Sequence, residues 1–190
     1  MSIKILRVAV ALMATMAATL ALGGTAQATQ KEGSERTQAI REILKLNPGS
    51  KQVSSDSVEL EPGVIMSLPP AEGTDMTTYL TCEWQWLCMW QNKSGGGNKL
   101  RFYDCDRWYY LENWHMPDGR DWRDRISSIH NAQSGGSKGR AEFVDTLGNG
   151  AWHTVGHVDV QDGRADLSKD MSSDGRTWND RIDKVWACAS

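Results

Sequence analysis

Several enzyme signatures are missing from this chain of 190 residues. It has no Gly-x-Ser-x-Gly nucleophile elbow, no glycine-rich phosphate loop ahead of a helix, and no His-Glu-x-x-His pair. No two cysteines are separated by two residues, the spacing that usually opens a zinc site. The scattered carboxylates have no spacing that requires the acid pair of a glycosidase. These absences predict a protein that is not an enzyme and that needs no cofactor, apart from the calcium considered below.

Basic clusters and repeated long apolar runs are missing as well. The formal net charge is -3 and no Lys/Arg cluster offers phosphate contacts, which argues against a nucleic-acid partner. One apolar run, residues 8–22, follows Lys4 and Arg7 and precedes Ala26-Gln27-Ala28. This order is typical of a secretory signal peptide, and the run is too short for a membrane anchor. We therefore expect residues 1–28 to be removed, and the rest to be secreted, extracellular and free of the membrane.

The composition favours strands, tight turns and disulfides. Trp occurs 9 times against 2 Phe, and Gly occurs 18 times, a mixture that suits short strands better than helices. Four cysteines in an oxidising compartment predict two disulfides. Three pairings are possible and the sequence alone does not choose among them. The pairing that we favour joins Cys82 to Cys88, as a local clip, and Cys105 to Cys188.

The segment before the cysteines predicts a helix and a hairpin. An apolar stripe over residues 35–46 predicts a helix, which Ser34 can cap and Asn47-Pro48-Gly49 ends. The stripe consists of Ala39, Ile40, Ile43 and Leu44. Residues 58–66, around Pro62-Gly63, predict a hairpin. Residues 29–77 would then be an N-terminal extension, either part of the fold or a cleaved pro-segment, ahead of a disulfide-stapled domain at 78–190.

That domain contains an internal repeat. Residues 118–129 align without a gap on residues 174–185, with Asp, Gly, Arg, Trp, Asp, Arg and Ile in common. The same offset places residues 87–90 over 143–146. Each copy reads as an apolar strand, a glycine-rich turn and a closing Trp-x-Asp-Arg-Ile segment. The repeat predicts two units, at 83–131 and 140–187, that form a mostly β sandwich of two Greek keys.

Four motifs carry a resemblance to a known family. They are the five-residue spacing of Cys82 and Cys88 with Met89-Trp90-Gln91-Asn92 after it, the glycines at 95–97, the Trp-x-Asp-Arg-Ile-Ser-Ser-Ile-x-Asn run at 122–131, and Asn-Pro-Gly-x-Lys-Gln at 47–52. With these motifs the sequence resembles a family of secreted actinobacterial peptidase inhibitors, of the metalloproteinase-inhibitor type. The resemblance implies a βγ-crystallin-like sandwich of two Greek keys, with a short helix and a hairpin before it. It also implies a secreted protease as the partner.

The contact loop of such an inhibitor is expected in a turn. The exposed turn at 92–98 is our candidate, and its contact residues would be Asn92, Lys93, Ser94 and Gly95. The loop at 132–139 is the alternative. Crystallin-like units usually carry an aromatic residue just before the hairpin glycine, and this chain has Ser94 there. A disulfide clip beside the turn would hold it preformed, which lowers the ordering cost of binding.

The repeat also resembles crystallin-type calcium sites, in which two acidic or Asn positions precede two hydroxyl positions by two residues. The copies at 123–128 and 179–184 each match it incompletely. The candidate ligands are Asp124, Ser127, Asn179 and Asp180. Calcium takes six to eight oxygen ligands, so these sets are poor. In the alternative interpretation, the aspartates cap turns and pair with nearby arginines.

Tryptophans and histidines form two further patterns. Trp84, Trp86 and Trp90 share the parity of one strand, which predicts either buried core or an aromatic row that stacks on sugars. His153 and His157 would lie on one face of a strand about 13 Å apart, too far for one metal ion. The alternatives to inhibition are therefore an extracellular module that binds glycan, cell wall or calcium, or a small antibacterial toxin on the same fold.

Overall fold

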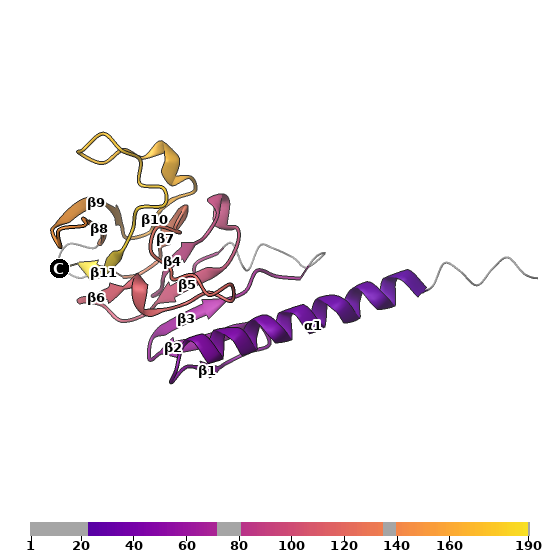
Figure 1. Cartoon of the computed structure of the whole chain (residues 1–190). Coiled ribbons are helices and arrows are strands. Elements are labelled where there is room, and N and C mark those ends of the chain that lie inside the picture. Colours follow the sequence, from indigo (N-terminus) through magenta and orange to yellow (C-terminus); the bar gives the residue numbers. More distant parts are fainter. Residues whose placement is uncertain (1–22, 72–80, 135–139, 190) are drawn as a thin grey trace, which may run out of the picture.

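The chain forms two antiparallel β-sheets and one long helix (Figure 1). The computed structural model describes residues 23–71, 81–134 and 140–189. One sheet has seven strands in the order β1-β2-β3-β5-β4-β7-β10, and the other has four in the order β6-β11-β8-β9. Within those ranges no helix is long and apolar enough to cross a membrane. The mostly β class predicted from the sequence is confirmed.

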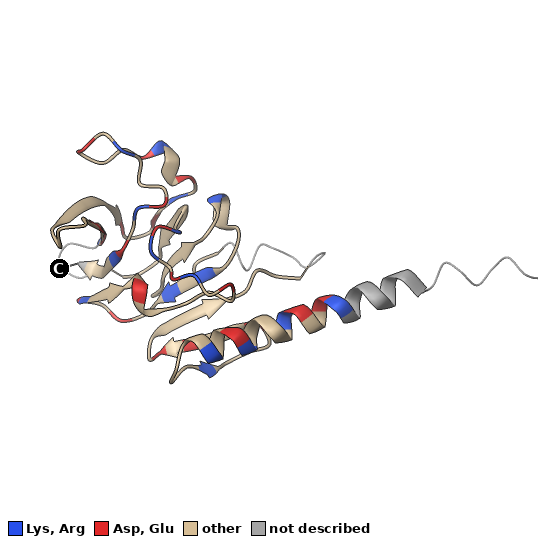
Figure 2. Ribbon diagram, in the orientation of Figure 1, with Lys and Arg blue, Asp and Glu red and all other residues tan. Residues whose placement is uncertain are grey.

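Helix α1 spans Gly23–Leu46 and is longer than predicted. It runs through Ser34, the expected cap, because no proline interrupts the sequence before it and the nearby Gly33 costs a helix only about 1 kcal/mol. Ile40 and Ile43 are buried against the sheet, as the apolar stripe predicted. The opposite face carries charges of both signs, which Figure 2 shows interspersed along the helix.

Asn47 ends the helix and ties it to the first unit. Its amide nitrogen donates to the carbonyl oxygens of Ile43, at 2.8 Å, and His115, at 2.9 Å. Its Oδ1 accepts from the backbone N–H of His115 at 2.7 Å. The side chain thus adds a second hydrogen bond to the Ile43 carbonyl, which also accepts from the Asn47 N–H at 3.0 Å, and bonds both backbone groups of the distant His115.

The predicted hairpin forms and extends the first sheet. Strands β2 (Ser57–Glu61) and β3 (Val64–Ser67) pair around Gly63, whose φ is +78°, and β1 (Lys51–Gln52) pairs with β2. Strand β3 then pairs with β5 of the core. The segment before the cysteines is therefore built into the sheet of the first unit.

The two repeat units exchange a strand. The first contains β4 (Leu87–Trp90), β5 (Lys99–Phe102), β6 (Arg107–Tyr110) and β7 (Ser128–Asn131). The second contains β8 (Arg140–Thr146), β9 (Trp152–Asp159), β10 (Asp162–Arg164) and β11 (Lys184–Ala189). The third strand of each unit, β6 or β10, pairs within the sheet of the other unit. This arrangement confirms the predicted sandwich of two Greek keys with the βγ-crystallin type of topology.

Reciprocal hydrogen bonds relate the units by an approximate twofold axis. The N–H of Asp124 donates to Ile182 O and the N–H of Asp180 donates to Ile126 O, at 3.3 and 3.1 Å. A second reciprocal pair starts from the short 3-10 turns Leu111–Asn113 and Leu167–Lys169. In this pair the N–H of Leu111 donates to Asp183 O, and the N–H of Leu167 donates to Ser127 O. The sequence repeat is therefore a structural repeat.

The register of the first strands departs from that repeat. Trp90 lies opposite Ser128 in the first unit, whereas Val144 lies opposite Lys184 in the second. The offset between the two repeat segments predicted that residues 87–90 align with 143–146. The strand pairing aligns them with 141–144 instead, so the prediction is wrong by two positions. The second unit accommodates two more residues between its first and last strands, and a motif alignment cannot detect such a length change.

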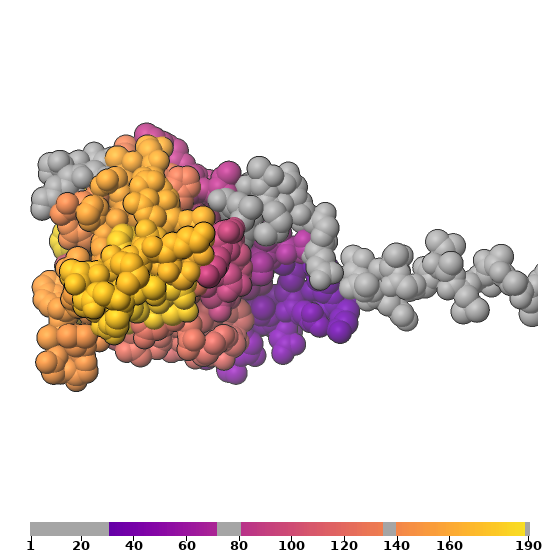
Figure 3. Space-filling view, turned by 90° about the horizontal axis from the view of Figure 1, so that it is seen from above, coloured from indigo at the N-terminus to yellow at the C-terminus, as the bar shows by residue number. Residues whose placement is uncertain are grey.

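The core lies between the sheets and contains the tryptophan of each repeat, Trp122 and Trp178. Gly156 on β9 makes room for Trp178, because a Cβ there would lie 1.9 Å from its Cζ2. The two disulfides join Cys82 to Cys88 and Cys105 to Cys188, so the favoured pairing is confirmed. Figure 3 shows the second unit, in orange and yellow, at the opposite end of the molecule from the indigo helix.

Candidate functional site

The turn between β4 and β5 is closed by its own hydrogen bonds. The N–H of Gln91 donates to Asn98 O at 3.0 Å, and that of Asn92 donates to Gly96 O at 2.9 Å. The side-chain amide of Asn98 donates to Gln91 Oε1 at 3.1 Å. A 3-10 turn at Lys93–Gly95 lies at its tip. The side chains of Asn92, Lys93 and Ser94 are exposed there, whereas Gly95, the fourth predicted contact residue, is buried because it packs against β7.

Its backbone has left-handed positions that other contacts hold. Ser94, where crystallin-like units usually have an aromatic residue, has a φ of 53°. Its N–H donates to Ala165 O at 2.7 Å, which fixes this less favourable conformation for a residue with a Cβ. Gly97 has a φ of +71°, and a Cβ there would lie 2.9 Å from the amide nitrogen of Asn92. The glycine-rich sequence is thus required by the turn.

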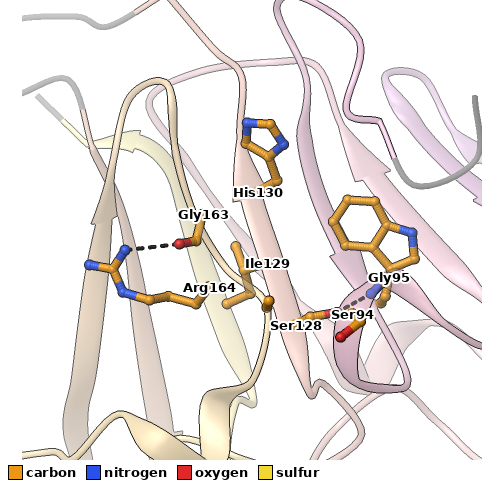
Figure 4. A pocket seen from close by; sticks show the side chains of 9 residues that line it. Ser94, Gly95, Ser128, Ile129, His130, Gly163 and Arg164 are labelled. Atoms are coloured by element: carbon orange, nitrogen blue, oxygen red, sulfur yellow. Dashed lines mark hydrogen bonds between the residues drawn. The ribbon is translucent and has the colours of Figure 1, made fainter. Parts of the chain in front are cut away.

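A buried hydroxyl anchors the turn to β7. Ser128 is 2% exposed, and its Oγ accepts from the N–H of Gly95 at 3.0 Å, the bond drawn in Figure 4. The same Oγ donates to the carbonyl oxygen of Asn92 at 2.7 Å. One side chain therefore bridges two points of the turn that lie three residues apart.

An ion pair anchors the turn to the second unit. Lys93 Nζ lies 3.1 Å from Asp166 Oδ1 and donates to Ser168 Oγ at 3.0 Å. The Ser168 hydroxyl, and after it the Lys93 ammonium, lowers the pKa of Asp166 to about 2. The carboxylate is therefore charged at any pH from mildly acidic upward, and the tie between the units persists there.

An open hollow of about 390 Å³ lies beside this turn. Its lining residues are Trp90, Ser94, Gly95, Ser128, Ile129, His130, Gly163, Arg164 and Ala165. Figure 4 shows Gly163 and Arg164 on one side of it, Ser94 and Gly95 on the other, and Ser128, Ile129 and His130 between them. Arg164 is engaged by Asp162 and by Asp170, at 2.5 and 3.3 Å, so its charge is already paired. A hollow of this kind can receive a side chain of a partner that docks on the turn.

The calcium candidates are brought only partly together. Ser127 Oγ donates to Asp180 Oδ1 at 3.4 Å, and the Asn179 amide donates to Asp180 Oδ2 at 2.6 Å. Asp124 occupies the equivalent turn of the other unit, with the same φ of 53° as Asp180. Burial, with the charges of neighbouring aspartates, raises the pKa of Asp124. Over the described ranges no three His, Cys, Asp or Glu side chains converge as a metal-binding group would need.

The three tryptophans near the first disulfide do not form a row. Gln85 has a φ of 75° and Trp86 N–H donates to Glu83 O, so the chain turns there and β4 begins only at Leu87. Trp90 is buried, while Trp84 is 62% exposed. Trp86 packs between the Tyr103 ring and the Arg101 guanidinium (centroid distances 5.2 and 5.0 Å). The shared parity inferred for them fails for Trp84, because the chain turns at Gln85. Trp86 and Trp90 keep it, since their rings lie against Arg101 and Lys99, two positions apart on β5.

The two histidines of β9 lie on opposite faces of the sheet. His153 pairs with Asp145 and His157 pairs with Glu142, positions of opposite parity on β8. A bulge opposite Phe143 and Val144 inserts one residue between them, so the prediction of a common face is wrong. His153 faces inward, with Nε2 3.7 Å from Asp174 Oδ2.

One predicted feature lies mostly outside the described residues, and one feature of the structure was not predicted. The alternative loop at 132–139 lies largely outside the described residues, of which only 132–134 belong to it. Conversely, Trp108, Trp152 and Trp186, which no motif singled out, meet on the four-stranded sheet. Their strands are far apart in the sequence, so only the local spacings could have indicated a common face. These are Trp108 with Tyr110 and Trp186 with Cys188, each two residues apart, and the same spacing also fits a buried strand.

Comparison with known proteins supports only a general likeness. No protein-family model and no curated protein sequence matches the chain. Among solved structures, one described as "Evolution of the eye lens beta-gamma-crystallin domain fold" is similar, with 11% identity and a TM-score of 0.35. The match covers 56% of this chain and 87% of that chain. The fold assignment rests on the strand exchange described above.

Proposed function

We propose that this protein is a secreted peptidase inhibitor that docks on its target through the turn Asn92–Gly95. The observation that carries the proposal is the way this turn is held. Contacts from three directions fix an exposed tip: from within the turn, from Ser128 on β7, and from Ala165 and Asp166 of the second unit. Such a tip keeps its shape without a partner.

Rigidity matters because binding must repay the cost of ordering flexible groups. Protease–inhibitor complexes are among the tightest of their size, and their backbones move little between free and bound states. A turn with Ser94 already in its left-handed conformation meets this requirement. The exposed side chain of Asn92 would then enter the groove of the protease, while Lys93 stays paired with Asp166 beside it.

The same contacts would protect the turn from cleavage. A protease that cut beside Ser94 would leave both new ends tied, one by Ser128 and the other by Gln91–Asn98 pairing. Ends held in place favour resealing over release. Two disulfides and the signal-like N-terminus are consistent with work in an extracellular medium rich in proteases.

The test is a titration of the oxidised protein, expressed with its own N-terminus, against a panel of secreted metalloproteases and serine proteases. Stoichiometric loss of one activity is expected. Ser128→Ala removes two hydrogen bonds that hold the turn but leaves the exposed surface unchanged. At about 0.5–1.5 kcal/mol for each bond, inhibition should weaken by about fivefold to a hundredfold, mainly through faster release.

Ser57→Ala is the matched control. Ser57 is also buried and shares a hydrogen bond with Ser67, but it lies in the N-terminal hairpin. The Ser57→Ala variant should inhibit the protease as the wild type does. Lys93→Ala removes the ion pair that ties the turn to Asp166 and should also weaken inhibition. The proposal is wrong if no protease in the panel is inhibited, or if Ser128→Ala and Ser57→Ala inhibit equally well.

A further inference from the structure

The outer face of the four-stranded sheet carries a row of side chains across all its strands. Trp108 on β6 lies directly opposite Trp186 on β11, which lies opposite Glu142 on β8, which lies opposite His157 on β9. Paired residues share one face of a sheet. The residues next to them in sequence are buried on the core side; they are Tyr109, Phe143, Val158 and Val185. The row therefore points away from the core.

Aromatic rings cover much of this face. The Trp108 ring lies 5.1 Å from that of Trp186 and 5.6 Å from that of Trp152, measured between centroids. Trp152 is 61% exposed, and Tyr110, two residues along β6, is 39% exposed. The tilted ring contacts hold the indoles in fixed orientations. Large aromatic residues gathered at a surface are the usual anchors of a binding site.

The charges on this face are paired within it. Arg140 Nε donates to Glu142 Oε1 at 2.9 Å, and Arg140 lies opposite Asp159 in the sheet. Lys184 Nζ lies 5.0 Å from the centroid of the Tyr110 ring. The face thus combines apolar rings with polar groups and has no surplus of one sign. A polyanion or an acidic lipid surface would need such a surplus.

We propose that this face binds an uncharged polysaccharide. A pyranose ring offers an apolar C–H face that can lie on an indole, and hydroxyl groups at its edge that can reach the Arg140–Glu142 pair. Successive sugars of a chain could then contact Trp152 and the Trp108–Trp186 pair. The proposal does not depend on protease inhibition, because the candidate contact turn belongs to the other sheet.

The test is retention of the purified wild-type protein on insoluble cellulose, chitin and xylan, followed by titration of Trp fluorescence with the matching soluble oligosaccharide. Retention on at least one of them is expected. Trp152→Ala should weaken binding by about tenfold or more, the effect of removing an aromatic anchor. Trp84→Ala is the matched control, since Trp84 is equally exposed (62%) but lies beside the other sheet. It should bind as the wild type does.

The outcomes separate this partner from others. Failure of the wild type to be retained on all three polysaccharides overturns the proposal, whatever the protease titration shows. Equal loss in the Trp152 and Trp84 variants overturns it as well, because the site would not be this face. A wild-type dimer in sedimentation that Trp152→Ala converts to a monomer would assign the face to a second copy of the chain, and this too would overturn it.

Discussion

The two disulfides should differ in what they contribute to stability. Cys105–Cys188 joins residues separated by 83 positions, and Cys82–Cys88 joins residues separated by 6. If a disulfide acts by restricting the unfolded chain, loop lengths of this order give about 4.5 kcal/mol for the long link and about 2.2 kcal/mol for the short one. The double variant Cys105→Ala/Cys188→Ala should therefore lose about 2 kcal/mol more than Cys82→Ala/Cys88→Ala.

The comparison controls for packing. Each pair has one fully buried cysteine, Cys88 or Cys188, so truncation to alanine removes a similar buried group in both variants. The measurement is the free energy of unfolding in guanidinium chloride, followed by Trp fluorescence, for the wild type and both variants. Equal losses, or a larger loss for the short link, would refute the argument from chain entropy.

Three further outcomes are expected. Gly156→Ala should cost about 1–3 kcal/mol, because its Cβ would collide with Trp178, whereas Gly148→Ala, with nothing within 4 Å, should stay within about 0.5 kcal/mol in the same unfolding measurement. Burial lowers the pKa of Lys99 to about 8, so between about pH 8 and 10 the unfolded state binds more protons than the folded state. The free energy of unfolding should therefore rise with pH over this range, and in Lys99→Met it should lack this rise. A chain that starts at residue 78 lacks β3, which pairs with β5, so it should unfold at a lower temperature than the full chain or precipitate. A melting temperature equal to that of the full chain would instead assign residues 29–77 to a dispensable pro-segment.

Much of the fold could be predicted because the repeat is local and dense. The Trp-x-Asp-Arg-Ile segments place a buried tryptophan and a left-handed aspartate at the same point of each unit. The apolar stripe of α1 and the hairpin around Gly63 follow from short-range patterns as well, and four cysteines leave only three pairings to choose from. Each of these features depends on residues close together in the chain, or on a count that allows few alternatives.

The errors share another cause, which is the insertion or turning of single residues. A left-handed Gln85 breaks the strand that was to align three tryptophans. One extra residue in β9 separates the faces of His153 and His157. Side-chain parity reverses with each such change, and no composition rule marks where it occurs.

The parts of the candidate sites also differ in how far they could be predicted from the sequence. The turn at 92–95 could be predicted, since glycines and polar residues mark it directly. The support from Ser128 and Asp166 could not, because it comes from strands and turns that only the tertiary fold brings near. The tryptophan face is harder still, because β6 reaches it by crossing to the sheet of the other unit.

That crossing also decides when the protein can fold. Strand β11 lies between β6 and β8, so the first unit leaves β6 without a neighbour, and the first sheet without β10, until the second unit has been made. Neither half can act as a template for the other during synthesis. The chain must keep β6 unpaired until β11 has emerged, and folding that depends on such distant contacts is slow. The long disulfide from Cys105 to Cys188 can likewise form only after the last strand has been made.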